Sequence, residues 1–318
     1  MQALYWNGEH LRLDPSYPAP EPDEHRALVR VRLAGICSTD HQIFRGYMGF
    51  RGIPGHEFVG EVSEGAVELR GQRVVGEINF ACGQCETCSQ GLGRHCPKRR
   101  VMGILGADGS FAEYVAVPTR NLHLVPEGVA DEEAVFTEPL AAAFEILEQI
   151  ELMPRDEVLV LGDGKLGLLC AQVLKLTGAR LTVVGKHERK LEILKRLGIH
   201  TVMLSDWRSR PADVVVEATG STSGLKVALG AVRPRGTLVL KSTVAEEHTL
   251  SLASLVINEV TVVGSRCGLF PPALQALAEK RVSVTPLIEK IYPLADGLEA
   301  IAHAARPGTL KVLLRAST

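Results

Sequence analysis

Four cysteines in one short segment constrain the fold of this chain more than any other feature. Cys82, Cys85, Cys88 and Cys96 follow the spacing C-x2-C-x2-C-x7-C. Four thiolates on a tight loop can surround one tetrahedral zinc ion and leave no open position, which defines a structural site. An iron–sulfur cluster is the main chemical alternative. Because the chain has seven cysteines, an odd number, this cluster indicates metal binding in a reducing compartment and not a disulfide framework, and we expect a cytoplasmic protein.

A second group of metal-type ligands lies closer to the N-terminus. Cys37 and the pair His56 and Glu57 offer a thiolate, an imidazole and a carboxylate within a short span. Zinc prefers these ligand types, and it binds cysteine only as the thiolate and histidine only as the neutral imidazole. Asp40 or Glu57 could bond the second imidazole nitrogen, or Glu57 could reach the metal itself.

The composition excludes several classes of partner. The 318 residues suffice for two domains, and a hydrophobic share of 46% with 23% charged residues is typical of a globular protein. A net charge of −2 predicts no nucleic-acid partner and no anionic membrane partner. No apolar run approaches about 20 residues, so no membrane span is expected. The N-terminus lacks a basic region followed by an apolar core, so no secretory signal is expected.

The first part of the chain is rich in short strands with glycine turns, which indicates a small barrel-like β-domain. We expect these strands at residues 27–33, 58–62, 72–76 and 111–117. Residues 131–150 then follow a helical period, with Glu138 directly before Pro139. Glu138 is either a first-turn carboxylate of this helix or a third ligand for a metal at Cys37 and His56.

From Asp156 onward, strands alternate with helices, which predicts a parallel sheet. An apolar strand at 157–161 runs into the loop Gly162-x-Gly164-x-x-Gly167, and a helix is expected at 168–176. In this context the first glycine permits a tight turn, the second lets the backbone approach a pyrophosphate, and the third allows close helix packing. Further strands are expected at residues 180–184, 213–217, 236–240 and 260–263.

The residues after the second of these strands usually select the dinucleotide. An acid there bonds the ribose hydroxyls of NAD and repels a 2′-phosphate. Here the position is Gly185, followed by Lys186, His187 and Arg189, so NADP is favoured over NAD. The alternative is a solvated basic helix start. The whole set expected to bind the cofactor is Gly162, Gly164, Lys165, Leu166, Gly167, Gly185, Lys186, His187, Arg189, Thr219, Gly220 and Arg266.

The C-terminal segment is too short to be a domain, so we expect it to rejoin the first one. Pro271 and Pro272 interrupt the alternation of strands and helices. Helices at 273–280 and 294–305 and a strand at 309–314 are expected after them.

Together these motifs resemble the zinc-containing medium-chain dehydrogenase/reductase family, which includes alcohol, sorbitol, glucose and threonine dehydrogenases. The resemblance covers nearly the whole chain. It implies an α/β protein with a GroES-like β-barrel catalytic domain at 1–140 and 269–318, and a doubly wound Rossmann domain at 141–268. It also implies two zinc ions per chain, NAD(P), and assembly into a homodimer or homotetramer.

Several roles are implied by this resemblance alone. Cys37 and His56 match catalytic zinc ligands, and Glu57 matches an acid that binds or neighbours the metal. Glu138 resembles the third-ligand position of sorbitol and glucose dehydrogenases, and Thr39 matches the hydroxyl of the proton relay. The family's relay histidine is replaced by Gln42, and only 18 residues separate Cys37 from His56.

The function implied is reversible hydride transfer between a secondary alcohol or polyol and NAD(P), with NADP favoured. A sugar or amino-alcohol dehydrogenase, acting for example on a threonine-like substrate, is the alternative enzyme. A non-catalytic dinucleotide sensor on the same scaffold is an alternative of another class, because a fold alone does not determine activity.

Overall fold

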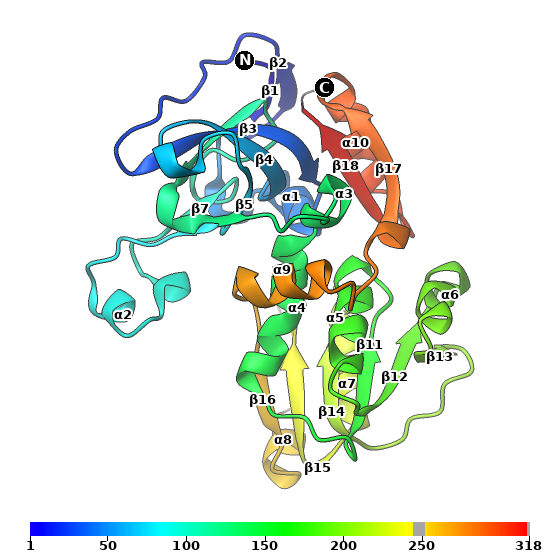
Figure 1. The fold of residues 1–318 in the computed structure, drawn as a ribbon. Helices are drawn as coiled ribbons and strands as arrows, with labels where there is room; N and C mark the ends of the chain where they lie inside the picture. The colour runs from blue at the N-terminus through cyan, green and yellow to red at the C-terminus, as the bar shows by residue number, and fades with distance from the viewer. Residues whose placement is uncertain (244–251, 317–318) are drawn as a thin grey trace. The chain divides into compact units, whose positions relative to one another are not determined.

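The computed structural model describes residues 1–243 and 252–316, and the chain forms two compact units (Figure 1). Unit one comprises Met1–Glu138, Phe270–Lys280 and Leu287–Thr318. Unit two comprises Pro139–Leu269 and Arg281–Pro286. Within the described ranges, no helix is long and apolar enough to cross a membrane.

Unit one is built on a seven-stranded sheet with β3 (Arg26–Gly35) at its centre. β3 pairs antiparallel with β4 (Glu57–Glu64), β9 (Tyr114–Pro118) and β18 (Lys311–Arg315). Because β18 lies near the C-terminus, this sheet joins strands from the N-terminal and C-terminal parts of the chain. The other strands of unit one are β1 (Ala3–Trp6), β2 (Leu11–Asp14), β5 (Arg73–Gly76), β6 (Asn79–Phe80), β7 (Arg100–Met102), β8 (Gly106–Ala107), β10 (Leu122–Leu124) and β17 (Ile288–Pro293).

Short helices connect these strands. They are α1 (Ser38–Ile43), α2 (Glu86–Ser89), α3 (Asp131–Ala134), α9 (Phe270–Ala278) and α10 (Gly297–Ala304). The core of the sheet comes from alternate residues of β3, because Ala27, Val29, Val31 and Leu33 are fully buried. This alternation is the pattern that predicted the strand from the sequence.

Unit two contains a six-stranded sheet in which every neighbouring pair is parallel. Its order, β13-β12-β11-β14-β15-β16, corresponds to chain order 3-2-1-4-5-6, which is that of a dinucleotide-binding doubly wound sheet. The predicted parallel sheet is therefore confirmed. The strands are β11 (Glu157–Leu161), β12 (Arg180–Gly185), β13 (His200–Met203), β14 (Ala212–Glu217), β15 (Val232–Leu240) and β16 (Thr261–Gly264).

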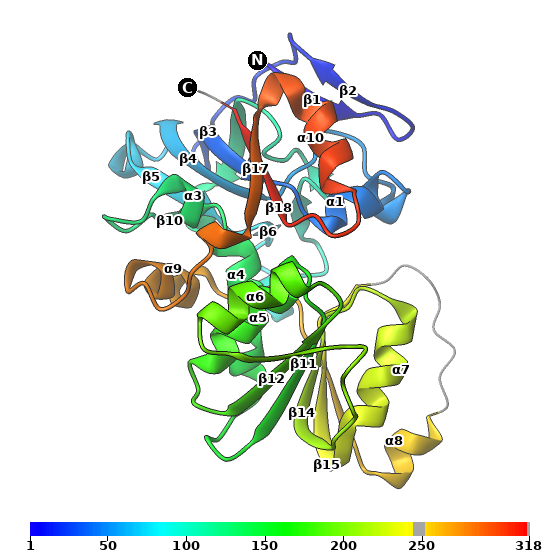
Figure 2. The ribbon, with the colours of Figure 1, turned by 90° about the vertical axis from the view of Figure 1, so that its right-hand side faces the viewer.

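Helices cover both faces of this sheet, and Figure 2 shows α7 and α8 on one side of it and α4 and α5 on the other. Ala228 and Ala231 of α7 join a buried cluster with Leu159, Val215 and Leu238 of the sheet. The helices of unit two are α4 (Thr137–Gln149, which starts in unit one), α5 (Lys165–Lys175), α6 (Glu188–Arg196), α7 (Thr222–Ala231) and α8 (Ala253–Ile257).

Several elements differ from their sequence predictions. The helix expected over 131–150 is split into α3 and α4, and the Thr137 hydroxyl donates to the Ala134 carbonyl at 2.7 Å where they meet. Pro139 lies in the first turn of α4, where a missing N–H breaks no helical hydrogen bond. For the same reason Pro271 and Pro272 do not interrupt the chain but lie in the first turn of α9. The strands that were not predicted are β1, β2, β6, β7, β8, β10, β13 and β17.

Candidate metal centres and dinucleotide site

Three metal-type side chains of unit one meet where β3 ends and β4 begins. The strand register pairs Gly35, the last residue of β3, with Glu57, the first residue of β4. Cys37 is the N-cap residue of α1, and His56 directly precedes β4. Donor atoms of Cys37, His56 and Glu57 consequently lie within 4.8 Å of one another. Strand pairing, and not proximity in sequence, closes this cluster.

Asp40 links two members of the cluster. The Cys37 N–H donates to Asp40 Oδ2 at 2.8 Å, and Asp40 Oδ1 lies 3.5 Å from His56 Nδ1. The Asp40 side chain is fully buried, so its position is well defined by packing. Thr39 lies beside the same cysteine, with its Oγ1 3.7 Å from Cys37 Sγ. One turn of α1 therefore orients the thiol, the imidazole and a hydroxyl together.

The surroundings of His56 favour positive charge. Burial opposes protonation of the ring, but the charge of Asp40 and the neighbouring Cys37 outweigh burial and raise the pKa of His56 well above its usual value. Metal ions bind only the neutral imidazole, so binding of a metal here displaces a proton. The same negative surroundings that favour an imidazolium also favour a bound cation.

Glu57 is paired with a lysine that sequence analysis did not single out. Glu57 Oε2 lies 2.5 Å from Lys311 Nζ, and both side chains are buried. Gly35 provides the room, because a Cβ at that position would lie 2.2 Å from Glu57 Oε2. The other oxygen, Oε1, is buried and has no hydrogen-bond partner among the residues that the structure describes. An unpaired buried acceptor is costly, and a metal held by Cys37 and His56 would satisfy it, so the three residues fit a zinc ion.

Lys311 opens β18 in the middle of an apolar run. Leu310 and Val312–Leu314 are all buried, and lysine is almost never fully buried unless it is paired. Burial lowers the pKa of Lys311, but the charges of Glu57 and Cys37 outweigh it and raise that pKa above its usual value. The lysine therefore remains a cation beside the cluster. Its place in an apolar strand was the signal that could have identified it.

Glu138 lies in the first turn of α4, and its charge also acts on Lys311. Its carboxylate is not among the three donors that lie within 4.8 Å of one another. Of the two predicted acids, Glu57 therefore lies with Cys37 and His56, whereas Glu138 acts electrostatically on Lys311.

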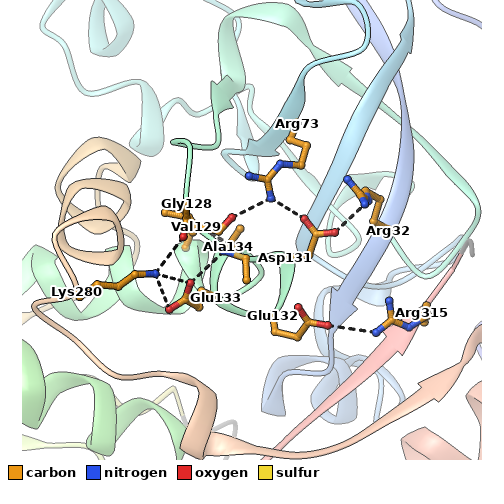
Figure 3. Close-up of polar contacts among 12 residues, drawn as sticks. Arg32, Arg73, Gly128, Val129, Asp131, Glu132, Glu133, Ala134, Lys280 and Arg315 are labelled. Carbon is orange, nitrogen blue, oxygen red and sulfur yellow. Dashed lines mark hydrogen bonds and ion pairs between the residues drawn. The ribbon is translucent and has the colours of Figure 1, made fainter.

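The start of α4 is held in place by ion pairs on the preceding α3 (Figure 3). Asp131 lies 3.0 Å from Arg32 and 2.9 Å from Arg73, which come from β3 and β5. Glu133 lies 2.8 Å from Lys280, just after α9. These contacts tie α3 to three other segments of unit one and so fix where the helix that carries Glu138 begins.

The four clustered cysteines of unit one form a second candidate metal site. The distance between Sγ atoms is 3.6 Å for Cys82 and Cys96, 3.5 Å for Cys85 and Cys88, 3.8 Å for Cys85 and Cys96, and 4.0 Å for Cys82 and Cys88. Zinc–sulfur bonds of about 2.3 Å place the sulfurs of a tetrahedral site about 3.8 Å apart. The spacing therefore fits a single zinc ion.

Two observations support metal ligation by these thiols. None of the seven cysteines, which all lie in the described ranges, forms a disulfide bond. Backbone N–H groups of Gln84 and Cys85 lower the pKa of the Cys82 thiol to about 6, which favours the thiolate that binds metals, whereas burial raises the pKa of the Cys88 thiol to about 11. An iron–sulfur cluster would distribute the thiolates over several irons and hold them farther apart, so the observed spacing favours the single ion.

In unit two, the three glycines after β11 have different surroundings. Gly162 has φ of 118°, and a Cβ there would lie 2.4 Å from the Ala218 carbonyl oxygen. A Cβ on Gly167 would lie 2.2 Å from the Gly162 carbonyl oxygen, so the start of α5 packs closely on the loop. Gly164, the N-cap residue of α5, has open space around its Cβ position. Open space at a helix N-terminus suits a pyrophosphate, so the loop fits a dinucleotide.

A cavity of about 330 Å³ lies beside this loop. The predicted residues that line it are Gly162, Gly164, Gly185, Lys186, His187 and Thr219. The predicted residues that are not part of its lining are Lys165, Leu166, Gly167, Arg189, Gly220 and Arg266. Lining residues that sequence analysis did not name include Asp163, Lys190, Ser221 and Ser223. The serines follow Thr219 in sequence, so their position after β14 was the available signal.

Comparison with known proteins matches two family models to successive parts of the chain. A sequence model of the alcohol dehydrogenase GroES-like domain matches residues 23–127, and a zinc-binding dehydrogenase model matches residues 166–280. The GroES-like and dinucleotide-binding parts of the predicted fold are thus confirmed. The chain is 32% identical to sorbitol dehydrogenase from Halalkalibacterium halodurans, over 93% of each chain.

Two solved structures illustrate the similarity in three dimensions. A zinc-binding dehydrogenase from Sinorhizobium meliloti 1021 bound to NADP superposes with a TM-score of 0.90 at 26% identity, covering 99% of this chain and 98% of that one. The alcohol dehydrogenase (rspB) from E. coli CFT073 in complex with NADH superposes with a TM-score of 0.91 at 28% identity, covering 99% of each chain.

Proposed function

Because this chain belongs to the zinc-containing medium-chain dehydrogenase/reductase family, we propose that Cys37, His56 and Glu57 hold its catalytic zinc. The protein is a zinc-dependent oxidoreductase that acts on alcohols or polyols with NAD(P). The observation that carries the site assignment is the meeting of three donor atoms within 4.8 Å, one of them from a carboxylate with an unpaired buried oxygen. Cys82, Cys85, Cys88 and Cys96 are proposed to hold the structural zinc.

The residues around the cluster are proposed to have different roles in alcohol oxidation. When bound, zinc supplies a Lewis acid that lowers the pKa of a substrate hydroxyl, and NAD(P) supplies the hydride acceptor. Thr39, whose hydroxyl lies 3.7 Å from Cys37 Sγ, is placed to accept the substrate proton and pass it outward. Asp40 orients His56, and Lys311 fixes one oxygen of Glu57 so that the other faces Cys37 and His56.

The proposed substrate is a secondary alcohol or polyol. The sorbitol dehydrogenase relative acts, by its name, on a polyol. Glu138 is proposed to be a further acid at this site. Its charge acts on Lys311, which in turn contacts Glu57. Glu138 can become a ligand of the zinc ion if Lys311 releases Glu57.

The test is nicotinamide absorbance during incubation of zinc-loaded protein with NAD or NADP and a panel of alcohols. We expect turnover of a secondary alcohol or polyol and none of matched primary alcohols. Turnover confined to amino alcohols would instead establish the threonine-like alternative. Dinucleotide binding without turnover of any substrate class, together with an empty Cys37 site by metal analysis, would contradict the enzyme assignment and favour a sensor.

We also propose that NADP is the preferred cofactor and that the protein is cytoplasmic. Lys186 and His187 line the cavity of unit two, and their side chains can attract a 2′-phosphate. The lack of disulfide bonds among the seven cysteines, all within the described ranges, is consistent with a reducing compartment.

A homodimer is the proposed assembly, either alone or as half of a tetramer. Among the described residues, β16 is the last strand of its sheet, and nothing pairs with its outer edge. Nearby apolar side chains are unusually exposed, with Val256 76% and Ile257 77% accessible. A second copy of the chain can pair with β16 about a two-fold axis, cover these side chains and continue the sheet.

Val256→Asp is therefore expected to convert the dimer to a monomer, because it places a charge in the centre of the apolar patch. Sedimentation equilibrium measures the mass directly. The matched control is Val67→Asp, since Val67 is 84% exposed on unit one and should leave the mass unchanged. A dimer that persists in Val256→Asp would place the interface elsewhere.

A further inference from the structure

Asp163 lies between the first two glycines of the dinucleotide loop, at a position where the sequence pattern prescribes no residue. The residue is 7% exposed and lines the cavity of unit two. Its Oδ2 accepts the backbone N–H of Lys186 at 2.8 Å and that of His187 at 2.6 Å. The Asp163 side chain, from the loop after β11, is thus held at the C-terminal end of the neighbouring strand β12.

The Asp163 side chain occupies the space next to Gly185. A Cβ on Gly185 would lie 2.6 Å from Asp163 Cβ and 2.7 Å from both Asp163 Cγ and Oδ2. Asp163 therefore fills the space that a side chain at position 185 would occupy. In folds of this kind, an acid at the end of the second strand bonds the ribose 2′-hydroxyl of NAD. Here a carboxylate reaches the same place from a different loop.

The two oxygens of Asp163 are unequally occupied. Oδ2 is engaged by two backbone N–H groups and lies 3.0 Å from His187 Nδ1, whereas Oδ1 lies 3.1 Å from the same His187 Nδ1. A carboxylate oxygen has two acceptor sites, so Oδ1 can accept a further hydrogen bond. The contact with His187 also places negative charge against one of the groups that would otherwise attract a phosphate.

Building on the proposed function, we propose that Asp163 is a cofactor-specificity residue. Its Oδ1 accepts hydrogen bonds from the adenosine ribose hydroxyls of NAD, and its charge opposes the 2′-phosphate of NADP. Lys186 and His187 act in the opposite direction, so the ratio of the two affinities reflects the balance between this acid and these cations. Gly185 is then required because any larger residue would displace Asp163.

The experiment measures direct binding of NADH and NADPH to the zinc-loaded protein by nicotinamide fluorescence, in wild type and in Asp163→Asn. Asparagine keeps the size and one acceptor but removes the charge. We expect the dissociation constant for NADH to rise by about tenfold and that for NADPH to stay unchanged or fall, since hydrogen bonds to charged groups are the strong ones. A higher dissociation constant for NADH without a higher one for NADPH distinguishes a change in specificity from a purely structural effect, because a structural effect would weaken the binding of both cofactors.

Two further variants sharpen the test. Asp206→Asn is the matched control, because Asp206 is exposed and lies outside the lining of the cavity, and it should change neither constant. Asp163→Gly should lose NADH affinity, and adding Gly185→Asp should restore it by moving the acid to the end of β12. Equal weakening of both cofactors in Asp163→Asn, or no change in either, would overturn the inference. Failure of the wild type to bind either dinucleotide would instead overturn the proposed function on which it rests.

Discussion

Replacement of Cys37 by alanine is expected to lower turnover by about a thousandfold or more while leaving dinucleotide binding intact. A Lewis acid contributes several kcal/mol to the transition state, and about 1.4 kcal/mol corresponds to a tenfold change in rate. Without the thiolate, His56 and Glu57 are too few to retain zinc at that site. Steady-state kinetics, fluorescence titration with NADPH and metal analysis check the three parts of this expectation.

Cys85→Ser is the contrasting variant, because it removes a thiolate from the four-cysteine cluster and not from the proposed catalytic site. We expect each variant to retain one zinc per chain where the wild type holds two, but with different consequences. Cys85→Ser should lower the thermal stability of the protein, since a structural zinc contributes directly to folding. Full activity of Cys37→Ala would contradict a catalytic role for the metal at Cys37.

Replacement of Lys311 by methionine is expected to reduce the free energy of unfolding by about 3 to 5 kcal/mol, because it leaves the buried Glu57 carboxylate without its cation. Glu57 and Lys311 are 1% and 2% exposed, so water cannot compensate for the lost partner. The measurement is best made by urea unfolding in the Cys37→Ala background. There no catalytic zinc can neutralise Glu57, while the structural zinc is retained.

Lys280→Met in the same background is the matched control. Lys280 pairs with Glu133 at 2.8 Å, but its side chain is 54% exposed. Exposed ion pairs contribute about 0 to 1 kcal/mol, so this variant should change the unfolding free energy little. Adding Glu57→Gln to Lys311→Met should recover much of the loss by removing the unpaired charge. An equal effect of Lys311→Met and Lys280→Met would show that the buried pair does not stabilise unit one.

The local motifs could be predicted because their chemistry restricts both residue type and spacing. The four-cysteine spacing requires a compact loop, and its Sγ atoms lie 3.5 to 4.0 Å apart as one zinc ion needs. The glycine loop was recognised from its place between a strand and a helix, since the tight turn and close packing at Gly162 and Gly167 exclude a Cβ. Element boundaries were less accurate where prolines lay in a first helical turn, as at Pro139 and Pro271, because proline there is compatible with the helix.

The sequence by itself determined the parallel sheet and the family, and it indicated the candidate metal ligands and the candidate dinucleotide loop, because each depends on residues close together along the chain. Only the tertiary structure decided which charges face those segments. Lys311 meets Glu57 across 254 positions of sequence because β18 and β4 both pair with β3. Asp163 reaches the end of β12 because parallel strands place their carboxyl ends at one edge of the sheet. Such partners follow from strand order and register, which no local pattern specifies.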